Sequence, residues 1–117
     1  MPVNPEWLKQ VKEESLEPEL RICDPHHHLW DHPDSRYLLE DLLEDTSSGH
    51  NVVSTVFVEC MSKYWDGTSK AMSPVGETEF VQSVANVCAT GDYGETKAAA
   101  AIVGHADLLL GDAVDEV

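Results

Sequence analysis

The chain has 117 residues, of which 42% are hydrophobic and 25% are charged, values that suit one globular domain and argue against wholesale disorder. Its 22 acidic residues outnumber its 7 Lys and Arg residues, which gives a formal net charge of -15. Such a charge repels nucleic-acid phosphates and anionic lipid headgroups, so binding to either of them has no electrostatic support.

The first 19 residues are predicted to be a helical extension that precedes the main domain at 20–117. In the stretch NPEWLKQVKEESLEP, Asn4 suits an N-cap, Pro5 fits the first helical position and Pro18 forbids continuation. We therefore expect a short exposed helix here. The stretch lacks the apolar run of a secretory signal, and no segment of the sequence approaches the roughly 20 apolar residues that cross a bilayer.

The cysteines indicate a reducing compartment. Cys23, Cys60 and Cys88 are far apart, odd in number and in no C-x-x-C arrangement, so neither a disulfide framework nor a zinc knuckle is predicted. Each lies in an apolar run, which suits a small buried side chain. Together with the N-terminal sequence, this pattern predicts a cytoplasmic protein.

Strand and helix patterns alternate from residue 20 onward. A brief strand is predicted over LRICD at 20–24, followed by the turn residues DHPDSR at 31–36. A helix over 37–45 has leucines at 38, 39, 42 and 43, which lie on one side of it. The nearly continuous apolar run from Val52 to Val58 then indicates a strand buried on both faces.

The second half of the chain continues this alternation. A polar loop at 61–76 leads to a helix over 77–90 that ends at Gly91, a residue that favours the position after a helix. A third buried strand is predicted over about 98–103. The last residues, GDAVDEV, resemble the opening turn of a helix with Asp112 as its N-cap.

This order predicts an α/β fold with a parallel βαβαβ sheet. Three strands and two full helices leave two open sheet edges and one bare sheet face, and the final helix has no basic or glycine residue to end it. We therefore expect the chain to be the front of a larger domain.

A run of three histidines follows the first predicted strand, in DPHHHLWD. Along an extended segment His26 and His28 point to the same side and His27 points away. Two imidazoles at the carboxyl end of a strand can share a divalent metal such as zinc, with Asp24 and Asp31 as partners that fix an imidazole tautomer. The alternative is that the run only forms a turn.

The ends of the other two strands carry titratable residues as well. Glu59 closes the second strand, and His105 and Asp107 follow the third, so three strands deliver such groups to one edge. Each has a structural alternative: Glu59 can pair with a helix N-terminus, His105 can cap a turn, and Asp107 can start the turn into the next helix.

Other polar and aromatic residues lie in loops. His32 and His50 stand among turn residues and are expected to be solvated. Tyr64 and Trp65 follow the second strand, where they can either line a small-molecule pocket or pack within the loop.

Several of these stretches resemble one family. ICDPHHHLWD, VVSTVFVEC, GETEFVQSVA and AAAIVGHADLLLGD are similar to the opening third of the amidohydrolase-related metal-dependent hydrolases. Within this family they look like the branch of lactonase-like and dicarboxylate-lactone hydrolases, whose first strand ends in D-x-H-x-H-x-W. The resemblance runs from about residue 20 onward and does not cover the helix before it.

The resemblance implies the first three strands of a (β/α)8 TIM barrel, incomplete in this chain, with the site at the carboxyl face of the strands. It also implies that His26 and His28 ligate a divalent metal, usually zinc, that activates water for attack on a carbonyl, although some lactonase relatives are thought to work without a metal. Asp24 and Trp30 match the rest of the motif. The later ligands of the family come from strands beyond the third, and a catalytic zinc takes three protein ligands.

Two functions are therefore expected. One is a fragment of a lactonase-like hydrolase acting on a lactone, ester or amide, with His26 and His28 as metal ligands and Glu59, His105 and Asp107 as catalytic candidates. Such a fragment is expected to be inactive unless a complementing chain or a second copy supplies the remaining strands. The other is a non-catalytic remnant that packs its open sheet on a partner chain.

Overall fold

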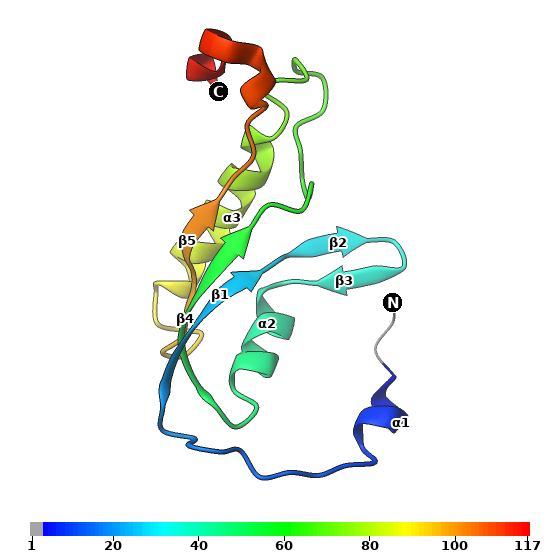
Figure 1. Ribbon diagram of the computed structural model, residues 1–117, viewed down its shortest axis with the longest axis vertical. Coiled ribbons are helices and arrows are strands. Elements are labelled where there is room, and N and C mark those ends of the chain that lie inside the picture. Colours follow the sequence, from blue (N-terminus) through cyan, green and yellow to red (C-terminus); the bar gives the residue numbers. More distant parts are fainter. Residues whose placement is uncertain (1–3) are drawn as a thin grey trace.

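Three parallel strands form the central sheet of the computed structural model, which describes residues 4–117 apart from the side chain of Pro5 (Figure 1). They are β1 (Arg21–His27), β4 (Asn51–Val58) and β5 (Lys97–Val103), in the order β1-β4-β5. The predicted α/β fold with a parallel sheet is confirmed. All three strands end at the same edge of the sheet, where loops and the last helix gather.

The first strand is longer than predicted. It continues past residue 24 to His27, which pairs with Phe57 of β4 after an irregularity between Asp24 and His27. The Asp24 carboxylate accepts a hydrogen bond from the His26 backbone N–H at 3.1 Å and so stabilises this irregular step. Two of the three histidines therefore belong to the strand itself.

Two helices cover one side of the sheet with a single apolar core. They are α2 (Leu39–Thr46), where the predicted leucine side faces inward, and α3 (Val75–Cys88), which packs along β5. Gly91 follows α3 with a φ of 85°, a left-handed conformation that glycine adopts without strain. The core consists of buried apolar residues from both helices, the strands and the start of the hairpin: Leu29, Leu39, Leu42, Phe57, Val81, Cys88, Ala98 and Ala99.

The central strand is buried mainly on its helical face. Thr55 and Phe57 are 0% exposed there, whereas Val56 and Val58 on the alternate face are only partly buried, so the prediction of a strand buried on both faces is wrong for this chain. On the buried face the Thr55 hydroxyl accepts a hydrogen bond from the Ala99 N–H at 2.9 Å. This bond satisfies the backbone of β5 where its register with β4 shifts.

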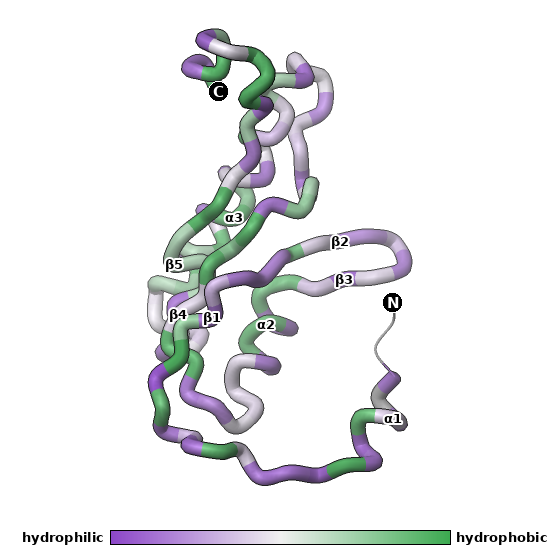
Figure 2. Tube along the Cα trace, viewed as in Figure 1, coloured by the Kyte–Doolittle hydropathy of each residue, from purple (hydrophilic) through white to green (hydrophobic). Residues whose placement is uncertain are grey.

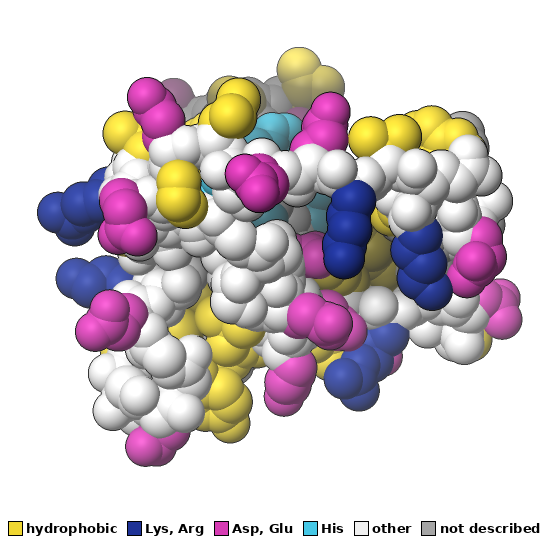
Figure 3. All heavy atoms as spheres, turned by 90° about the horizontal axis from the view of Figure 1, so that it is seen from below, with side chains coloured by type: hydrophobic (Ala, Val, Ile, Leu, Met, Phe, Trp, Pro, Cys, Tyr) yellow, Lys and Arg dark blue, Asp and Glu magenta, His cyan; other side chains and the backbone are white. Residues whose placement is uncertain are grey.

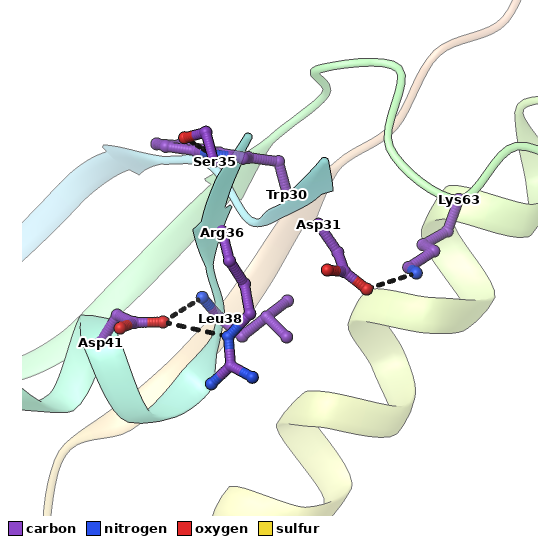
Figure 4. Close-up of polar contacts among 7 residues, drawn as sticks. All are labelled: Trp30, Asp31, Ser35, Arg36, Leu38, Asp41 and Lys63. Carbon is purple, nitrogen blue, oxygen red and sulfur yellow. Dashed lines mark hydrogen bonds and ion pairs between the residues drawn. The ribbon is translucent and has the colours of Figure 1, made fainter. Parts of the chain in front are cut away.

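A hairpin lies where the sequence predicts only a turn. β2 (Trp30–His32) and β3 (Ser35–Tyr37) pair antiparallel, and Trp30 stacks on Tyr37 with ring centroids 5.1 Å apart. The Trp30 indole N–H also donates to Ser35 Oγ at 2.9 Å, the contact at the upper left of Figure 4. Polar residues dominate these short strands, so no apolar alternation indicates them.

The N-terminal helix is much shorter than predicted. α1 comprises only Pro5–Leu8, and its Asn4 side chain accepts from the Trp7 N–H at 3.2 Å, as an N-cap does. Residues 9–20 are turns and irregular backbone that run beneath α2 and are largely hydrophilic in Figure 2. Trp7 and Leu8 are exposed, and a short helix without tertiary packing is marginal in water.

The last helix begins earlier than predicted and is of the 3-10 type. η1 (Leu108–Glu116) starts after Asp107, whose carboxylate accepts from the Leu109 N–H at 3.0 Å. The expected N-cap Asp112 is inside this element, just after a kink at Gly111. Asp107 therefore does start the turn into the next helix, as its structural alternative proposed.

The surface reflects the acidic composition. Acidic side chains are scattered over the face drawn in Figure 3, with few basic ones between them. Within the described part of the chain, no helix has the length and apolar character needed to cross a membrane. Of the cysteines, Cys88 is buried and Cys60 half-buried, but Cys23 is exposed, so its predicted burial is wrong; all three are free thiols.

Candidate functional site

His26 and His28 come together at the end of β1. Their Nε2 atoms lie 3.2 Å apart and the two rings meet edge to face, with centroids 4.9 Å apart. His26 is exposed and His28 half-buried. Strand alternation explains the pairing, since His27 between them turns to the other side.

The ring of His28 is oriented by the central strand. Its Nδ1 lies 2.7 Å from the carbonyl oxygen of Val58, which can only accept, so Nδ1 carries the proton and Nε2 of a neutral His28 keeps a lone pair. In the absence of a metal, His26 Nε2–H then donates to His28 Nε2. A shift of the His26 proton to Nδ1 leaves both Nε2 lone pairs free.

The resulting pair fits half of a zinc site. Two nitrogens that are each about 2.0–2.1 Å from a tetrahedral zinc ion lie roughly 3.3 Å apart, and the Nε2 atoms of His26 and His28 are 3.2 Å apart. The carbonyl partner of His28 is also the type of group that fixes a metal-ligating imidazole. Among the residues that the structure describes, however, no group of three or more His, Cys, Asp and Glu side chains is arranged to hold a metal.

The two aspartates near this pair do not have the predicted role. Asp24 bonds a backbone N–H rather than an imidazole, and Asp31 forms an ion pair with Lys63 at 2.9 Å, visible in Figure 4. The hydrogen bond and positive charge of Lys63 lower the pKa of the Asp31 carboxyl. The imidazole partner is instead a backbone carbonyl, which no sequence pattern marks.

His27 belongs to the core side of the sheet. It is 7% exposed, its ring meets Phe57 edge to face at 5.8 Å, and neither ring nitrogen has a hydrogen-bond partner among the described residues. Burial lowers the pKa of His27 because it disfavours the charged imidazolium. His27 is therefore a neutral packing residue.

Glu59 and His105 form a second pair, at the ends of β4 and β5. His105 Nδ1 lies 3.0 Å from Glu59 Oε2, an ion pair when the imidazole is protonated. The Glu59 backbone N–H donates to the Val103 carbonyl at 2.9 Å. A carboxylate this close to Nδ1 favours the neutral tautomer with the proton on Nδ1, whose Nε2 has a free lone pair. Glu59 and His105, which were expected at the same edge of the sheet, thus lie side by side there, and both side chains remain partly exposed.

These two residues line a cavity of about 520 Å³. Asp107, Tyr64 and Lys70 also contribute to its wall. Burial, together with negatively charged neighbours, raises the pKa of the Tyr64 hydroxyl, which therefore stays protonated. The cavity is large enough for a small molecule and combines apolar walls with a few polar groups.

Trp65 does not share this role. Its indole N–H donates to Glu79 of α3 at 3.3 Å, and it packs beside Gly76 rather than lining the cavity. His32 and His50 are exposed, as expected. Of the two loop aromatics, only Tyr64 is therefore placed to meet a ligand.

The histidine pair and the Glu59–His105 pair are neighbours through the end of β4. Val58 bonds His28 through its carbonyl, and Glu59 is the next residue. Their side chains nevertheless open into different cavities, because His26 and His28 line a separate hollow of about 330 Å³ with Trp30 and Tyr37. All five candidate residues therefore lie at one edge of the sheet, but in two groups.

Sequence reasoning missed one buried acid. Glu77, in the first turn of α3, is 1% exposed. Its Oε1 accepts hydrogen bonds from the backbone N–H groups of Cys60 and Ser62, at 3.0 and 2.6 Å. Its position in the first helical turn is the only signal in the sequence, and that signal predicts a solvated residue.

Comparisons of the chain with protein-family models, with curated proteins and with solved structures find no match.

Proposed function

We propose that this chain carries part of the active site of a metal-dependent hydrolase of the amidohydrolase type, acting on a lactone, ester or amide. The observation that carries the proposal is the separation of 3.2 Å between His26 Nε2 and His28 Nε2, with His28 held by the Val58 carbonyl. In this proposal β1, β4 and β5 are the first three strands of a (β/α)8 barrel, whose sites lie at the carboxyl ends of strands.

In this proposal His26 and His28 are ligands of a divalent ion, zinc by preference for nitrogen donors. When bound, the ion supplies an activated water and polarises the substrate carbonyl. The chain's own contribution is to orient the two rings and to hold the proton of His28 on Nδ1, away from the ligand atom.

Glu59 and His105 are proposed to move protons during turnover. The Glu59 carboxylate fixes the His105 tautomer at 3.0 Å, which leaves Nε2 as a base that can accept a proton and later return it to the leaving oxygen or nitrogen. Asp107, which caps η1, is assigned to structure and adds negative charge to the wall. Tyr64 and Lys70 are proposed to contact the small-molecule substrate.

Two histidines leave the metal site one protein ligand short of the usual three. We propose that the missing ligand comes from a complementing chain or from a second copy of this one. Without it, the isolated chain is expected to bind zinc weakly and to turn over little substrate.

A second candidate function is a non-catalytic module that packs against a partner chain. It is favoured by the exposure of large apolar side chains in η1, where Leu108 is 78% and Leu109 is 95% exposed. Such a protein would use its open sheet and this helix for contact, with the histidines as surface residues.

Zinc binding by isothermal titration calorimetry tests the proposal. We expect His26→Ala and His28→Ala each to weaken zinc binding by about tenfold or more, since even loss of an outer partner of a zinc ligand costs 10–100-fold. His32→Ala is the matched control, because His32 is exposed on the hairpin and should change nothing.

The same titration separates the two candidate functions. Equal zinc affinity in all four proteins would overturn the metal-site proposal. Absence of zinc binding together with concentration-dependent assembly in analytical ultracentrifugation would favour the non-catalytic module.

A further inference from the structure

The Glu77 carboxylate is bonded to a loop rather than to its own helix. Both hydrogen bonds to Oε1 come from residues that precede it by 17 and 15 positions, Cys60 and Ser62. Its Oε2 is buried without a partner among the described residues. A buried carboxylate oxygen without a partner is unfavourable, so the two hydrogen bonds to the loop are what stabilise the Glu77 carboxylate in this position.

The loop that Glu77 holds has a strained backbone. Met61 and Lys63, on either side of Ser62, have φ angles of 66° and 53°, a region that residues other than glycine rarely adopt. Such conformations persist only where the surroundings determine them strongly, and they gather at functional sites. The two hydrogen bonds that the Glu77 carboxylate accepts, from the Cys60 and Ser62 N–H groups, constrain the backbone at the centre of this stretch.

The helix approaches this loop as closely as its backbone allows. A Cβ atom on Gly76, the residue before Glu77, would lie 2.5 Å from Trp65 Cδ1 and 2.6 Å from the Lys63 carbonyl oxygen. The absence of a side chain at Gly76 therefore lets the first turn of α3 press against residues 63–65. This contact brings the Glu77 carboxylate within reach of the loop N–H groups.

The bonds of Glu77 also determine where Glu59 points. The peptide unit after Glu59 is oriented by the bond from the Cys60 N–H to Glu77, and the unit before it by the bond from the Glu59 N–H to Val103. Because peptide units are planar, orienting both of them sets the direction of the Glu59 Cα–Cβ bond, from which the side chain extends. Glu59 then meets His105, and Tyr64, further along the same loop, reaches the cavity.

We propose that Glu77 is a positioning residue, which holds the strained loop at 59–64 so that Glu59 pairs with His105. It does not line the cavity and is not expected to touch a substrate. The inference rests on the proposed function only in giving the Glu59–His105 pair a catalytic task. The geometric claim can be tested without any substrate.

The test is nuclear magnetic resonance on the full chain and its Glu77→Gln variant. The glutamine keeps one acceptor oxygen, but its bonds to the loop lose their charge assistance, and its NH2 group meets a buried position without an acceptor. We expect amide exchange at Cys60 and Ser62 to become faster by about tenfold to a hundredfold, as local opening of a charge-assisted bond predicts. We also expect the His105 imidazole to lose its preference for the Nδ1–H tautomer, read from its nitrogen shifts.

Glu79→Gln is the matched control. Glu79 lies on the exposed side of the same helix, and its acceptor role toward Trp65 survives the change, so neither readout should move. A folded Glu77→Gln protein with unchanged exchange and unchanged His105 tautomer would overturn the inference. So would uniformly faster exchange in β1, β4 and β5 with the tautomer unchanged, since that is the signature of a purely structural residue.

If the Glu77→Gln variant does not fold, amide exchange in the wild-type chain provides the test. There the Cys60 and Ser62 amides should exchange as slowly as those within β4, and fast exchange at both would reject the inference. Zinc binding by the histidine pair is measured separately, so the proposed metal site and the Glu77 inference can fail independently.

Discussion

At the scale of single residues, the three consecutive histidines have two different environments. His26 and His28 are partly open to solvent with their Nε2 atoms together, whereas His27 is packed against Phe57 on the side of the helices. The alternation of an extended chain produces this division, and burial then keeps His27 neutral. One sequence motif thus combines a candidate ligand pair with a core residue.

Replacement of the buried histidine should make stability less sensitive to acid. The pKa of His27 is lowered by burial in the folded state from its usual 6.5, so the unfolded chain takes up a proton first and stability falls as the pH drops below about 6.5. His27→Leu should reduce this loss between about pH 6.5 and 5, a window above the range of most carboxylates. Urea denaturation at a series of pH values measures it.

His32→Leu is the control for this experiment, because His32 is exposed and should leave the pH dependence as it is. The largest slope that one proton can give is ~1.4 kcal/mol per pH unit. If wild type and His27→Leu lost stability in parallel over this window, the neutral core role of His27 would be wrong. The nearby groups Asp24, His26 and His28 remain in both proteins.

At the scale of elements, side chains repair the irregular steps of the strands. Thr55 receives the Ala99 N–H where β5 shifts register, and Asp24 receives the His26 N–H where β1 does. The Ala99 N–H is buried, and a buried N–H without a partner is costly, so Thr55 allows β5 to be irregular with its backbone satisfied.

The Thr55→Val change tests this role at constant shape. Valine fills the same space but cannot accept a hydrogen bond, so the Ala99 N–H is left buried and unpaired, at a cost of about 1–3 kcal/mol in the free energy of unfolding. Thr55 is 0% exposed and its bond measures 2.9 Å, so water offers no substitute. Thr55→Ser, which keeps the hydroxyl, should lose less, and the reverse order in urea denaturation would contradict the prediction.

Apolar patterns made the sheet and its two helices predictable. Val52 to Val58 and the leucines of α2 show the periods of a strand and a one-sided helix, and both elements are observed. The N-terminal helix and the hairpin were predicted wrongly because caps and turn residues describe local preference, while their lengths depend on tertiary packing. The bounds of an element are therefore less predictable than its existence.

The candidate site was predictable to the same extent. Parallel strands end at one edge, so the placement of Glu59 and His105 at that edge followed from the order of the elements. The bond from His28 to the Val58 carbonyl and the burial of Glu77 did not, because a backbone partner and a desolvated carboxylate depend on the packing of distant segments. The sequence thus identified the candidate site residues and missed the groups that orient them.

At the scale of the whole molecule, negative charge opposes the compact state. The formal charge is -15, and the ion pairs of Lys or Arg in the described part of the chain are only Lys9–Glu6, Arg36–Asp41 and Lys63–Asp31, all at the surface. Surface pairs contribute little, so repulsion among the remaining carboxylates is the dominant long-range term.

Salt should therefore stabilise the fold. Raising NaCl from about 0.1 M to about 1 M shortens the screening length from about 10 Å to about 3 Å, which weakens repulsion between separated carboxylates. We expect the unfolding midpoint to rise by several degrees, because ~1 kcal/mol corresponds to about 4–8 °C in a domain of this size. Scanning calorimetry in NaCl and in KCl should give equal increases, and a decrease in both would contradict the argument.

One amide group at the end of β4 has a consequence for the two pairs together. The planar unit between Val58 and Glu59 accepts from His28 with its oxygen and donates to Val103 of β5 with its nitrogen. An amide that accepts a hydrogen bond at its oxygen and donates one from its nitrogen is polarised, so each bond strengthens the other. A cation bound at His28 Nε2 would make the Nδ1–H group a stronger donor to the Val58 carbonyl. The amide would then be more polarised, and its N–H group, which belongs to Glu59, would form a stronger hydrogen bond with Val103 of β5.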